Sequence, residues 1–587
     1  MVFLAGLKGL LPCAVRNLIR SNKLNISNTS GMAEGKYKGF VQANVIIMHK
    51  SFANDFEKFC QANDGPLPLL YRSKPGEWKC PFLSNSSDIR SDCLQYKKYE
   101  HGISTGIVTN LKEYSEQFKD MVTFYLGCSF TFEKALQKAG IPVRNVEQKC
   151  NVSMYKTAVP CCDTECFHCN LIVTMRYIPK DKLKECVQIT HPMKKSHGAP
   201  VHIGSPDSLG IKDLSSPEYG DAVQAHPGDV PVFWACGVTG IEAVINCKAP
   251  LAFTHSPGCM FITDLEIEDD ASGNDKDLPE VYCISQDPLH YSIASTAAVK
   301  KIRGLENIIA IDPGNRGVKH LFSQDELLKA CLSISHAKSV LITTGFPTHF
   351  NYEPPEENDG PPGAIAMAAI LKAMEKNVVI VTDQRALDLN RKIIKESVEQ
   401  EILQTSVPVI SYQSNSPDSA LQFLCEDGNP EKPRFNHLIA IERAGMAADG
   451  IGDGGNELGM GKVKEATKKH IKNGDVIACD VEADFAVVAG VANWGGYAVA
   501  CGLYILKTCE IHDRYLRKAV GYPRFSKYKN WASALPSVAK EENMLKILQR
   551  HHVRSGITAS LAMEVDALPF FNIHSNLIER LREETFK

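Results

Sequence analysis

Short apolar runs alternate with helix-like stretches through the second half of this 587-residue chain. The apolar runs cover 339–344, 377–382, 437–441 and 475–479, and the helix-like stretches between them include 362–376 and 387–403. Buried apolar strands that alternate with helices predict a parallel sheet covered by helices. Ligands bind such sheets at the carboxyl ends of the strands. The polar residues expected at those ends are Thr343, Thr344, Asp383, Glu442, Arg443 and Asp480.

The first half is less regular. Its strand-like runs, 171–175 and 230–234, are separated by long loops, which predicts a mixed α+β domain. An acidic, polar stretch at 269–277 and the turn-forming run 312–317 mark a boundary between the halves. We therefore expect an α+β domain over 40–284, a connecting segment near 285–301, and an α/β domain over 302–587.

Composition narrows the class of protein. The chain is 44% hydrophobic and 23% charged, as soluble globular proteins are. Its net charge of -3 gives no basis for nucleic-acid binding. No apolar run reaches the roughly 18 residues of a membrane-spanning helix. Composition does not indicate the oligomeric state.

The amino terminus differs from the rest of the chain. Residues 1–31 contain no Asp or Glu, while Lys8, Arg16, Arg20 and Lys23 are basic and leucines recur at helical spacing. An acid-free, amphipathic, Arg-containing start is typical of a mitochondrial transit peptide. We predict a transit peptide over 1–33 and localisation in the mitochondrial matrix; the alternative is a disordered or surface-helix tail.

A dense run of reactive side chains extends from His197 to Asp264. Gly and Pro recur within it, and they fix turns where side chains from different strands can converge. Histidines in such turns act as acids, bases or metal ligands, and carboxylates orient them. The candidate catalytic residues are His197, His202, Asp221, His255 and Asp264. Cys236 in the same run is either a nucleophile or, as we favour, a packed or pocket-lining thiol.

Two further features of the first half are ambiguous. Arg176 follows an apolar strand, where its guanidinium can bind a substrate carboxylate or form a structural ion pair. Cys166 and Cys169 have the spacing of half a zinc site, but no second such pair lies nearby. Ordinary loop cysteines are the favoured interpretation.

The second half has a glycine-rich run at 450–461. Backbone N–H groups in such loops bind anions, but this run lacks the phosphate-loop pattern. Its Asp453, Asn456 and Glu457 suit a metal ion or an ammonium group better than a phosphate. Asp480, Glu482 and Asp484 alternate along an extended segment, either as a metal or amine site or as a solvated acidic edge.

Ordered motifs along nearly the whole chain resemble the D-glutamate cyclases of the mitochondrial type. The first half, which is also similar to a family of bacterial hydro-lyases, matches at 127–130, 151–155, 173–176, 197–204, 219–221, 231–237 and 255–258. The second half matches at 312–317, 344–347, 357–363, 442–445 and 452–461. The resemblance implies conversion of D-glutamate to 5-oxo-D-proline and water. It adds these candidate substrate-binding residues to Arg176: Tyr155, Trp234, Asp312, Asn315, Arg316, Asp359, Asp453, Asn456 and Glu457.

The reaction needs a base for the α-ammonium group and an acid or a metal for the departing oxygen. We expect Arg176 to hold a substrate carboxylate, His197 or His202 to act as base, and Asp221 to orient that histidine. His255 or Asp264 would assist loss of water. No cofactor is required by the sequence, although a divalent metal could serve as the Lewis acid.

One departure from the family pattern follows Gly450. The relatives carry an additional segment before the glycine-rich run, whereas here Asp449 and Gly450 lead directly into it. The missing piece resembles a helix and part of a strand, as exon skipping would remove. Two alternatives stay open: a hydro-lyase of the first-half family that acts on another small carboxylic acid, and, because of this gap, a metabolite-binding isoform without activity.

Overall fold

The computed structural model describes residues 11–23, 29, 40–266, 277–412, 417–443, 482–523 and 530–587. The chain forms two compact units. Unit 1 comprises Met1–Ile293 with Ile511–Arg524, and unit 2 comprises Ala294–Glu510 with Phe525–Lys587. Residues 511–524 thus belong to unit 1, although they lie within the range predicted for the second domain. None of the described helices is both long and apolar enough to cross a membrane.

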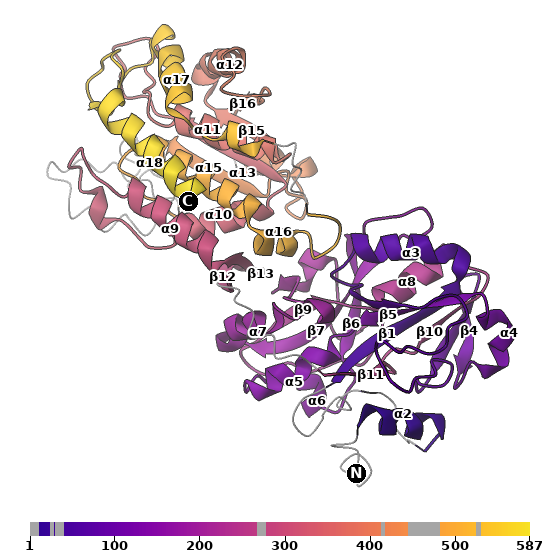
Figure 1. Ribbon diagram of the computed structural model, residues 1–587. Helices are drawn as coiled ribbons and strands as arrows, with labels where there is room; N and C mark the ends of the chain where they lie inside the picture. Colours follow the sequence, from indigo (N-terminus) through magenta and orange to yellow (C-terminus); the bar gives the residue numbers. More distant parts are fainter. Residues whose placement is uncertain are drawn as a thin grey trace. The chain divides into compact units, whose positions relative to one another are not determined.

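Unit 1 is built on antiparallel sheets. The largest has the strand order β2-β5-β1-β10-β3-β4, with β11 also paired to β1, and the second has the order β6-β7-β9-β8 (Figure 1). The strands are β1 (Phe40–His49), β2 (Leu69–Arg72), β3 (Tyr96–Glu100), β4 (Ile103–Val108), β5 (Met121–Gly127), β6 (Ser153–Pro160), β7 (Asn170–Pro179), β8 (His202–Ile203), β9 (Asp229–Ala235), β10 (Ala252–His255), β11 (Phe261–Glu266), β12 (Pro279–Gln286) and β13 (Leu289–Ser295).

Helices pack on these sheets by their apolar faces. In α3, Phe56 and Phe59 recur on one face and join the core beneath β1 and β5. The helices of unit 1 are α2 (Pro12–Arg20), α3 (Lys50–Ala62), α4 (Ser115–Phe118), α5 (Phe130–Lys138), α6 (Arg144–Glu147), α7 (Leu183–Thr190), α8 (Thr239–Cys247) and most of α16 (Glu510–Leu516). Unit 1 is therefore the mixed α+β domain predicted from its irregular strand spacing.

Unit 2 is built on a parallel sheet with the order β16-β15-β14-β17. Its strands β14 (Ser339–Gly345), β15 (Asn377–Thr382) and β17 (His437–Arg443) coincide with the apolar runs predicted as strands, which confirms the helix-covered parallel sheet. The run at 475–479 lies outside the described residues. The other strands are β16 (Val409–Ser411) and the antiparallel pair β18 (Glu564–Val565) and β19 (Leu568–Pro569).

Helices α11 and α15 position the carboxyl edge of this sheet. Helix α11 packs against β14, β15 and β17 and against α15 (Figure 1). Helix α15 has buried residues on nearly every face. The helices of unit 2 are α9 (Thr296–Ile309), α10 (Glu326–His336), α11 (Pro361–Ala373), α12 (Gln384–Glu399), α13 (Pro417–Leu424), α15 (Ala492–Thr508), α17 (Val538–Arg550) and α18 (Ser575–Phe586). Two prolines open α11, where their missing N–H groups cost no helical hydrogen bond.

Candidate functional site: a carboxylate cluster in unit 2

Three buried carboxyl groups, Glu357, Asp359 and Asp566, gather where the chain leaves β14 and enters α11. Their exposed fractions are 4%, 2% and 7%. An extended segment delivers Glu357 and Asp359, because Glu357 forms a parallel bridge with Arg554 and the Asn358 N–H donates to the Arg554 carbonyl at 2.8 Å. Buried carboxylates without matching cations are costly, so such a cluster needs a physical explanation.

Asp359 is held by backbone donors from α15. Its Oδ1 accepts from the Asn493 N–H at 2.9 Å and the Gly360 N–H at 3.0 Å, and its Oδ2 accepts from the Ala492 N–H at 2.9 Å. These bonds favour the charged form, but burial and the nearby charge of Asp566 outweigh them. The pKa of Asp359 is consequently raised to about 7.

The pKa of Glu357 is raised further than that of Asp359. Burial is the largest cause, followed by the charges of Asp359 and Asp566, and together they raise the pKa of Glu357 to about 9. Gly556 lies against its carboxyl group, since a Cβ at that position would stand 1.7 Å from Glu357 Oε2. At neutral pH Glu357 is therefore an acid that carries its proton, beside an aspartate poised to gain or lose one.

Arg316 supplies the opposing charge. Its Nη1 donates to Asp566 Oδ2 at 2.9 Å and its Nη2 donates to the Gly490 carbonyl, while its charge opposes the raised pKa of both Glu357 and Asp359. Asp312 fixes the turn that carries Arg316, because its carboxylate accepts from the backbone N–H groups of Arg316 and Gly317 at 3.0 and 2.7 Å. Asn315 occupies that turn with a φ of 51°. Asp312, Asn315, Arg316 and Asp359 were all predicted as substrate-binding residues, and the structure brings them into one neighbourhood.

The edge of the sheet beside this cluster is strained. Gly360 has a φ of 97°, and a Cβ there would lie 2.6 Å from Glu442 Cβ and 2.7 Å from Thr344 Oγ1. Glu442, at the end of β17, itself has a φ of 42°, which is uncommon outside glycine. The Thr344 hydroxyl is buried with no hydrogen-bond partner in the described part of the chain. Strain and an unsatisfied hydroxyl beside perturbed acids are typical of functional sites.

Asp383 and Arg443 lie at the carboxyl ends of β15 and β17, on either side of β14. Arg443 donates to both carboxylate oxygens of Asp383, at 2.9 and 2.6 Å, and lowers the pKa of that carboxyl group. These predicted strand-end residues thus pair with each other. Asp453, Asn456, Glu457 and Asp480 lie outside the described residues. Within the described ranges, no group of three or more His, Cys, Asp or Glu side chains is arranged to hold a metal ion.

The histidines predicted as catalytic in unit 1 are buried and occupy separate environments. His197 Nδ1 donates to the Gly65 carbonyl at 2.9 Å, and burial lowers the pKa of His197 to about 4. His202 Nε2 donates to the Ser205 carbonyl at 2.7 Å, and burial holds its pKa well below the usual value. His255 Nδ1 accepts from the Val45 N–H at 3.1 Å, and burial lowers its pKa to about 4. All three are neutral at physiological pH.

The two aspartates predicted beside them have other partners. Asp221 is exposed, and its Oδ2 accepts from the Asn151 N–H at 2.7 Å rather than from a histidine. Asp264 accepts from Arg16 Nη2 at 2.8 Å and from the Asn85 N–H at 2.9 Å. In this structure the Asp221 carboxylate therefore caps the backbone of the turn around it, and the orientation of a histidine by Asp221 stays a prediction.

Arg176 forms the structural ion pair that was its alternative interpretation. Its guanidinium is fully buried, donates to Glu133 Oε1 at 2.6 Å, and lies 4.8 Å from the ring centre of Phe132 and 5.6 Å from that of Trp234. Tyr155 is also buried and donates to the Leu214 carbonyl at 2.7 Å. A substrate carboxylate would have to replace Glu133 to use Arg176 as predicted.

The cysteines are thiols wherever the structure describes them. In the cluster that includes Cys166, the Cys161 and Cys169 sulfur atoms lie 4.0 Å apart. Cys236 is buried, and burial raises its pKa to about 12, so it is protonated at neutral pH. Packing is the interpretation that fits both observations.

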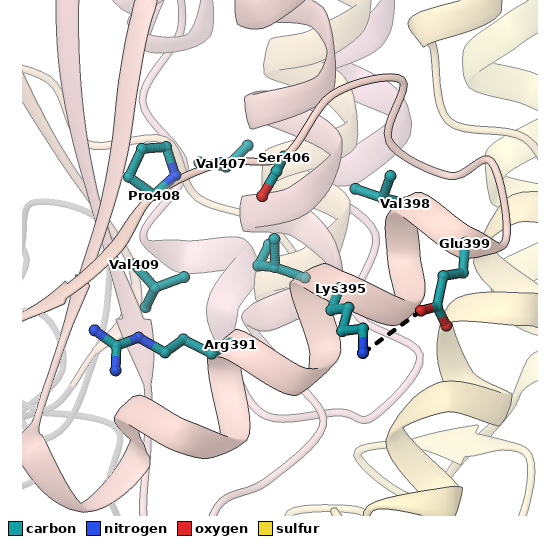
Figure 2. Close-up of a pocket in the computed structure, with 9 residues that line it drawn as sticks. Arg391, Lys395, Val398, Glu399, Ser406, Val407, Pro408 and Val409 are labelled. Carbon is teal, nitrogen blue, oxygen red and sulfur yellow. Dashed lines mark ion pairs between the residues drawn. The ribbon is translucent and has the colours of Figure 1, made fainter.

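A groove of about 450 Å³ lies elsewhere in unit 2, between α12 and the chain that leads into β16. Figure 2 shows Val398, Val407 and Val409 along it, with Lys395 and Glu399 paired at its rim, 3.9 Å apart. Its charged groups are exposed surface residues, whereas the carboxylate cluster is buried and strongly perturbed. The groove therefore offers apolar contact rather than chemistry.

Glu357, Asp566 and Asn493 are not among the residues predicted from the sequence. Glu357 precedes Asp359 by two positions in the 357–363 motif, which could have indicated it as a partner on the same face of an extended segment. Asp566 and Asn493 come from distant segments that carry no local signal. Only the tertiary fold joins them to the site.

The fold and the cluster define an α/β unit with a buried carboxylate site, joined to a mixed α+β unit. A family model described as D-glutamate cyclase matches residues 122–264, and one described as D-glutamate cyclase-like, C-terminal, matches 305–451 and 449–582. The mitochondrial D-glutamate cyclase of Homo sapiens is 52% identical over 621 aligned positions, which cover 100% of this chain and 99% of that protein. The chain belongs to the D-glutamate cyclase family.

Shorter bacterial relatives match the first half only. A "Putative hydro-lyase" of Natranaerobius thermophilus is 45% identical over 40% of this chain and 89% of its own length. The "Putative hydro-lyase YcsI" of Bacillus subtilis is 42% identical over 44% of this chain and 97% of its own length. These relatives thus consist almost entirely of sequence that matches the first half of this chain.

Proposed function

We propose that this protein is a carbon–oxygen lyase that cyclises D-glutamate to 5-oxo-D-proline and water in the mitochondrial matrix. Family membership supports the reaction, and the amphipathic, acid-free start of the chain supports a transit peptide over 1–33. We assign the reaction centre to unit 2. The observation that carries this assignment is the buried pair Glu357 and Asp359, with pKa values raised to about 9 and about 7.

The reaction needs one general acid, which donates a proton, and one general base, which accepts a proton. Cyclisation forms a bond between the α-nitrogen and the γ-carbon and breaks a bond from that carbon to oxygen. Asp359 removes a proton from the α-ammonium group, while Glu357 protonates a γ-carboxylate oxygen and makes the carbon electrophilic. The nitrogen then attacks, and its second departing proton passes to the Glu357 carboxylate. Asp359 returns its proton to the leaving hydroxyl, which departs as water, so both groups end as they began.

Arg316 and the surrounding backbone position the substrate. Arg316 donates to Asp566, and its charge acts against the raised pKa values of Glu357 and Asp359, so it is a cation at this cluster that can bind a substrate carboxylate. The carboxylates in turn favour the ammonium group. Holding amine and γ-carboxyl together in a folded conformation supplies the proximity on which ring closure depends.

Variants of the two acids test this assignment. We expect Glu357→Gln and Asp359→Asn each to lower kcat by about 100-fold or more, the usual size of a general acid–base contribution. Glu306→Gln is the matched control, since Glu306 is also buried with a raised pKa but accepts hydrogen bonds from the Asp325 and Leu327 N–H groups. Unchanged D-glutamate turnover in Glu357→Gln would remove the assignment to unit 2.

A second candidate function is a hydro-lyase reaction of unit 1 on another small carboxylic acid. The bacterial relatives favour it, because they consist almost entirely of sequence that matches the first half. Assaying Glu357→Gln against hydroxy acids separates the two, because a unit 1 activity would persist in that variant.

A further inference from the structure

Asp566 enters the carboxylate cluster from the tip of a tight hairpin. Strands β18 and β19 pair antiparallel with Val565 opposite Leu568, so Asp566 and Ala567 form a two-residue turn. Both residues have a positive φ, of 52° and 62°, as the common two-residue hairpin turn requires. Aspartate tolerates this left-handed conformation. The side chain at the tip of this hairpin is buried, whereas most hairpin tips face water.

Hydrogen bonds from three other parts of unit 2 fix this hairpin. The Ala567 N–H donates to the Ser555 hydroxyl at 3.3 Å. His574 Nε2 donates to the Leu568 carbonyl at 3.2 Å, and Trp494 Nε1 donates to His574 Nδ1 at 2.9 Å. Ser555, Trp494 and His574 are all buried. The position of Asp566 is therefore set by the fold itself, as a binding residue requires.

The two oxygens of the Asp566 carboxylate have different surroundings. Oδ2 accepts from Arg316 Nη1 at 2.9 Å. Oδ1 lies beside Gly556, where a Cβ would stand 3.1 Å from Asp566 Oδ1 and 1.7 Å from Glu357 Oε2. Among the described residues, neither Asp566 Oδ1 nor the Glu357 carboxyl group has a hydrogen-bond partner. Buried oxygens of this kind are costly unless a ligand satisfies them.

The charges of the cluster indicate which ligand group satisfies them. Glu357 carries its proton at neutral pH, so the charged members are Arg316, Asp566 and the fraction of Asp359 that is ionised. Arg316 already donates to Asp566 and to the Gly490 carbonyl. Two aspartates against one arginine leave a negative charge when Asp359 ionises. A cationic hydrogen-bond donor is the complement of this arrangement.

We propose that Asp566 is a specificity-determining residue of the reaction centre, and that its Oδ1 binds the α-ammonium group of the substrate. The proposal rests on the proposed function, which places cyclisation at Glu357 and Asp359. An ammonium group has three N–H donors, so it can donate to Asp566 and still present a proton to Asp359, the proposed base. A dicarboxylate without an amino group loses this bond and meets the negative charge of Asp566 instead.

Calorimetric titration of the full chain at pH 7 with D-glutamate and glutarate tests the proposal. The two ligands share a carbon skeleton and differ by the amino group. Glu357→Gln serves as the background, so that turnover does not contribute to the heat. We expect D-glutamate to bind this variant at least about tenfold more tightly than glutarate, as one charge-assisted hydrogen bond provides.

Addition of Asp566→Asn should change the two affinities in different directions. D-glutamate is expected to bind about tenfold or more weakly, because its ammonium group loses a charged acceptor. Glutarate should bind equally or more tightly, because Arg316 then faces an uncharged amide. This divergence separates recognition from a loss of structure, which would weaken both ligands. Asparagine also keeps an oxygen acceptor and tolerates the left-handed turn.

Asp325→Asn is the matched control. Asp325 also has a positive φ, of 70°, and accepts from Arg303 Nε and Nη2 at 2.6 and 2.9 Å, but it begins α10 rather than joining the carboxylate cluster. Its variant should leave both affinities unchanged.

Three results would overturn the role of Asp566: no preference for D-glutamate over glutarate, equal weakening of both ligands by Asp566→Asn, or unchanged D-glutamate binding in that variant. The proposed function is judged separately, by turnover of D-glutamate in the unsubstituted chain. If the preference depends on Asp566 and that chain does not cyclise D-glutamate, ammonium recognition stands and the proposed function falls. If the chain cyclises D-glutamate and Asp566→Asn keeps the preference, the function stands and this inference falls.

Discussion

Asn493 and Asp359 are hydrogen-bonded to each other at the amino terminus of α11. The Asn493 N–H donates to Asp359 Oδ1 at 2.9 Å, and Asn493 Oδ1 accepts from the N–H groups of Gly360 and Gly363 at 3.0 and 2.8 Å. A side chain from α15 thus caps α11, and the same residue orients the proposed base. A change at Asn493 is therefore expected to affect both the capping of α11 and the position of the Asp359 carboxylate.

Asn493→Ala is expected to lower both stability and turnover. It removes an acceptor from two backbone N–H groups of a buried helix terminus, which costs about 1–2 kcal/mol. Thermal unfolding measures this loss, and D-glutamate turnover at a temperature where the variant stays folded measures the effect on Asp359. Asn493→Asp keeps the acceptor, so it should recover the helix cap but bring a further negative charge to the base. Equal stability of Asn493→Ala and the unsubstituted chain would show that the cap contributes nothing.

The raised pKa of Glu357 makes stability fall with pH. Its carboxyl group keeps its proton up to about pH 9 in the folded chain but loses it near 4.5 when unfolded. The folded state therefore binds more protons between these values, and stability decreases across that window by up to about 1.4 kcal/mol per pH unit. Asp359 adds the same trend between about pH 4 and pH 7.

Glu357→Gln should abolish the contribution of residue 357 to this decrease of stability with pH. Urea unfolding from pH 5 to pH 9 gives the measurement, and we expect a flatter decline for the variant than for the unsubstituted chain. Below pH 4.5 both forms of residue 357 are neutral, so the two chains should differ least there. Parallel curves would mean that Glu357 ionises normally in the folded chain.

The ion pair between Glu133 and Arg176 gives a prediction for unit 1. Glu133→Gln leaves a fully buried guanidinium without its counter-charge, which is expected to cost about 3–5 kcal/mol. The double variant Glu133→Gln with Arg176→Met removes both charges and should recover much of that stability. Chemical unfolding of the three variants measures this. A structural role predicts recovery of D-glutamate turnover with stability in the double variant, whereas a substrate-binding Arg176 predicts turnover that stays lost.

The sequence predicts β14, β15 and β17 of the parallel sheet well because each of them is a local apolar pattern, whereas the short β16 was not predicted. The runs at 339–344 and 377–382 are apolar on both faces, and both become buried central strands. The site is less predictable, because its members depend on tertiary proximity. Asp359 and Arg316 lie in visible motifs, yet Asp566 is a single aspartate near the end of the chain with no pattern around it. In unit 1, His197 and His255 bond to the backbone from buried positions. A sequence cannot separate such histidines from catalytic ones, so their catalytic role stays a prediction.

The predicted transit peptide includes a helix that is docked on unit 1. Within α2, Arg16 is fully buried and donates to the Ile262 carbonyl at 2.7 Å and to Asp264 at 2.8 Å, while Arg20 pairs with the buried Asp92. Burial raises the pKa of Asp92, and Arg20 opposes that shift. Cleavage after residue 33 would remove both arginines, so a chain that begins at residue 34 is expected to unfold at a lower temperature than the full chain.

Arg16→Met in the full chain should cost about 1–3 kcal/mol, less than a fully buried pair because the Asp264 side chain is one-quarter exposed. A double-mutant cycle with Asp264→Asn isolates the pair from the packing of Val15 and Ile19. If the shortened chain is as stable as the full chain, α2 contributes nothing to the folded unit and is free to act only in targeting. A large loss, with additive effects of Arg16→Met and Asp264→Asn, would instead attribute the stability of the docked helix to its apolar face.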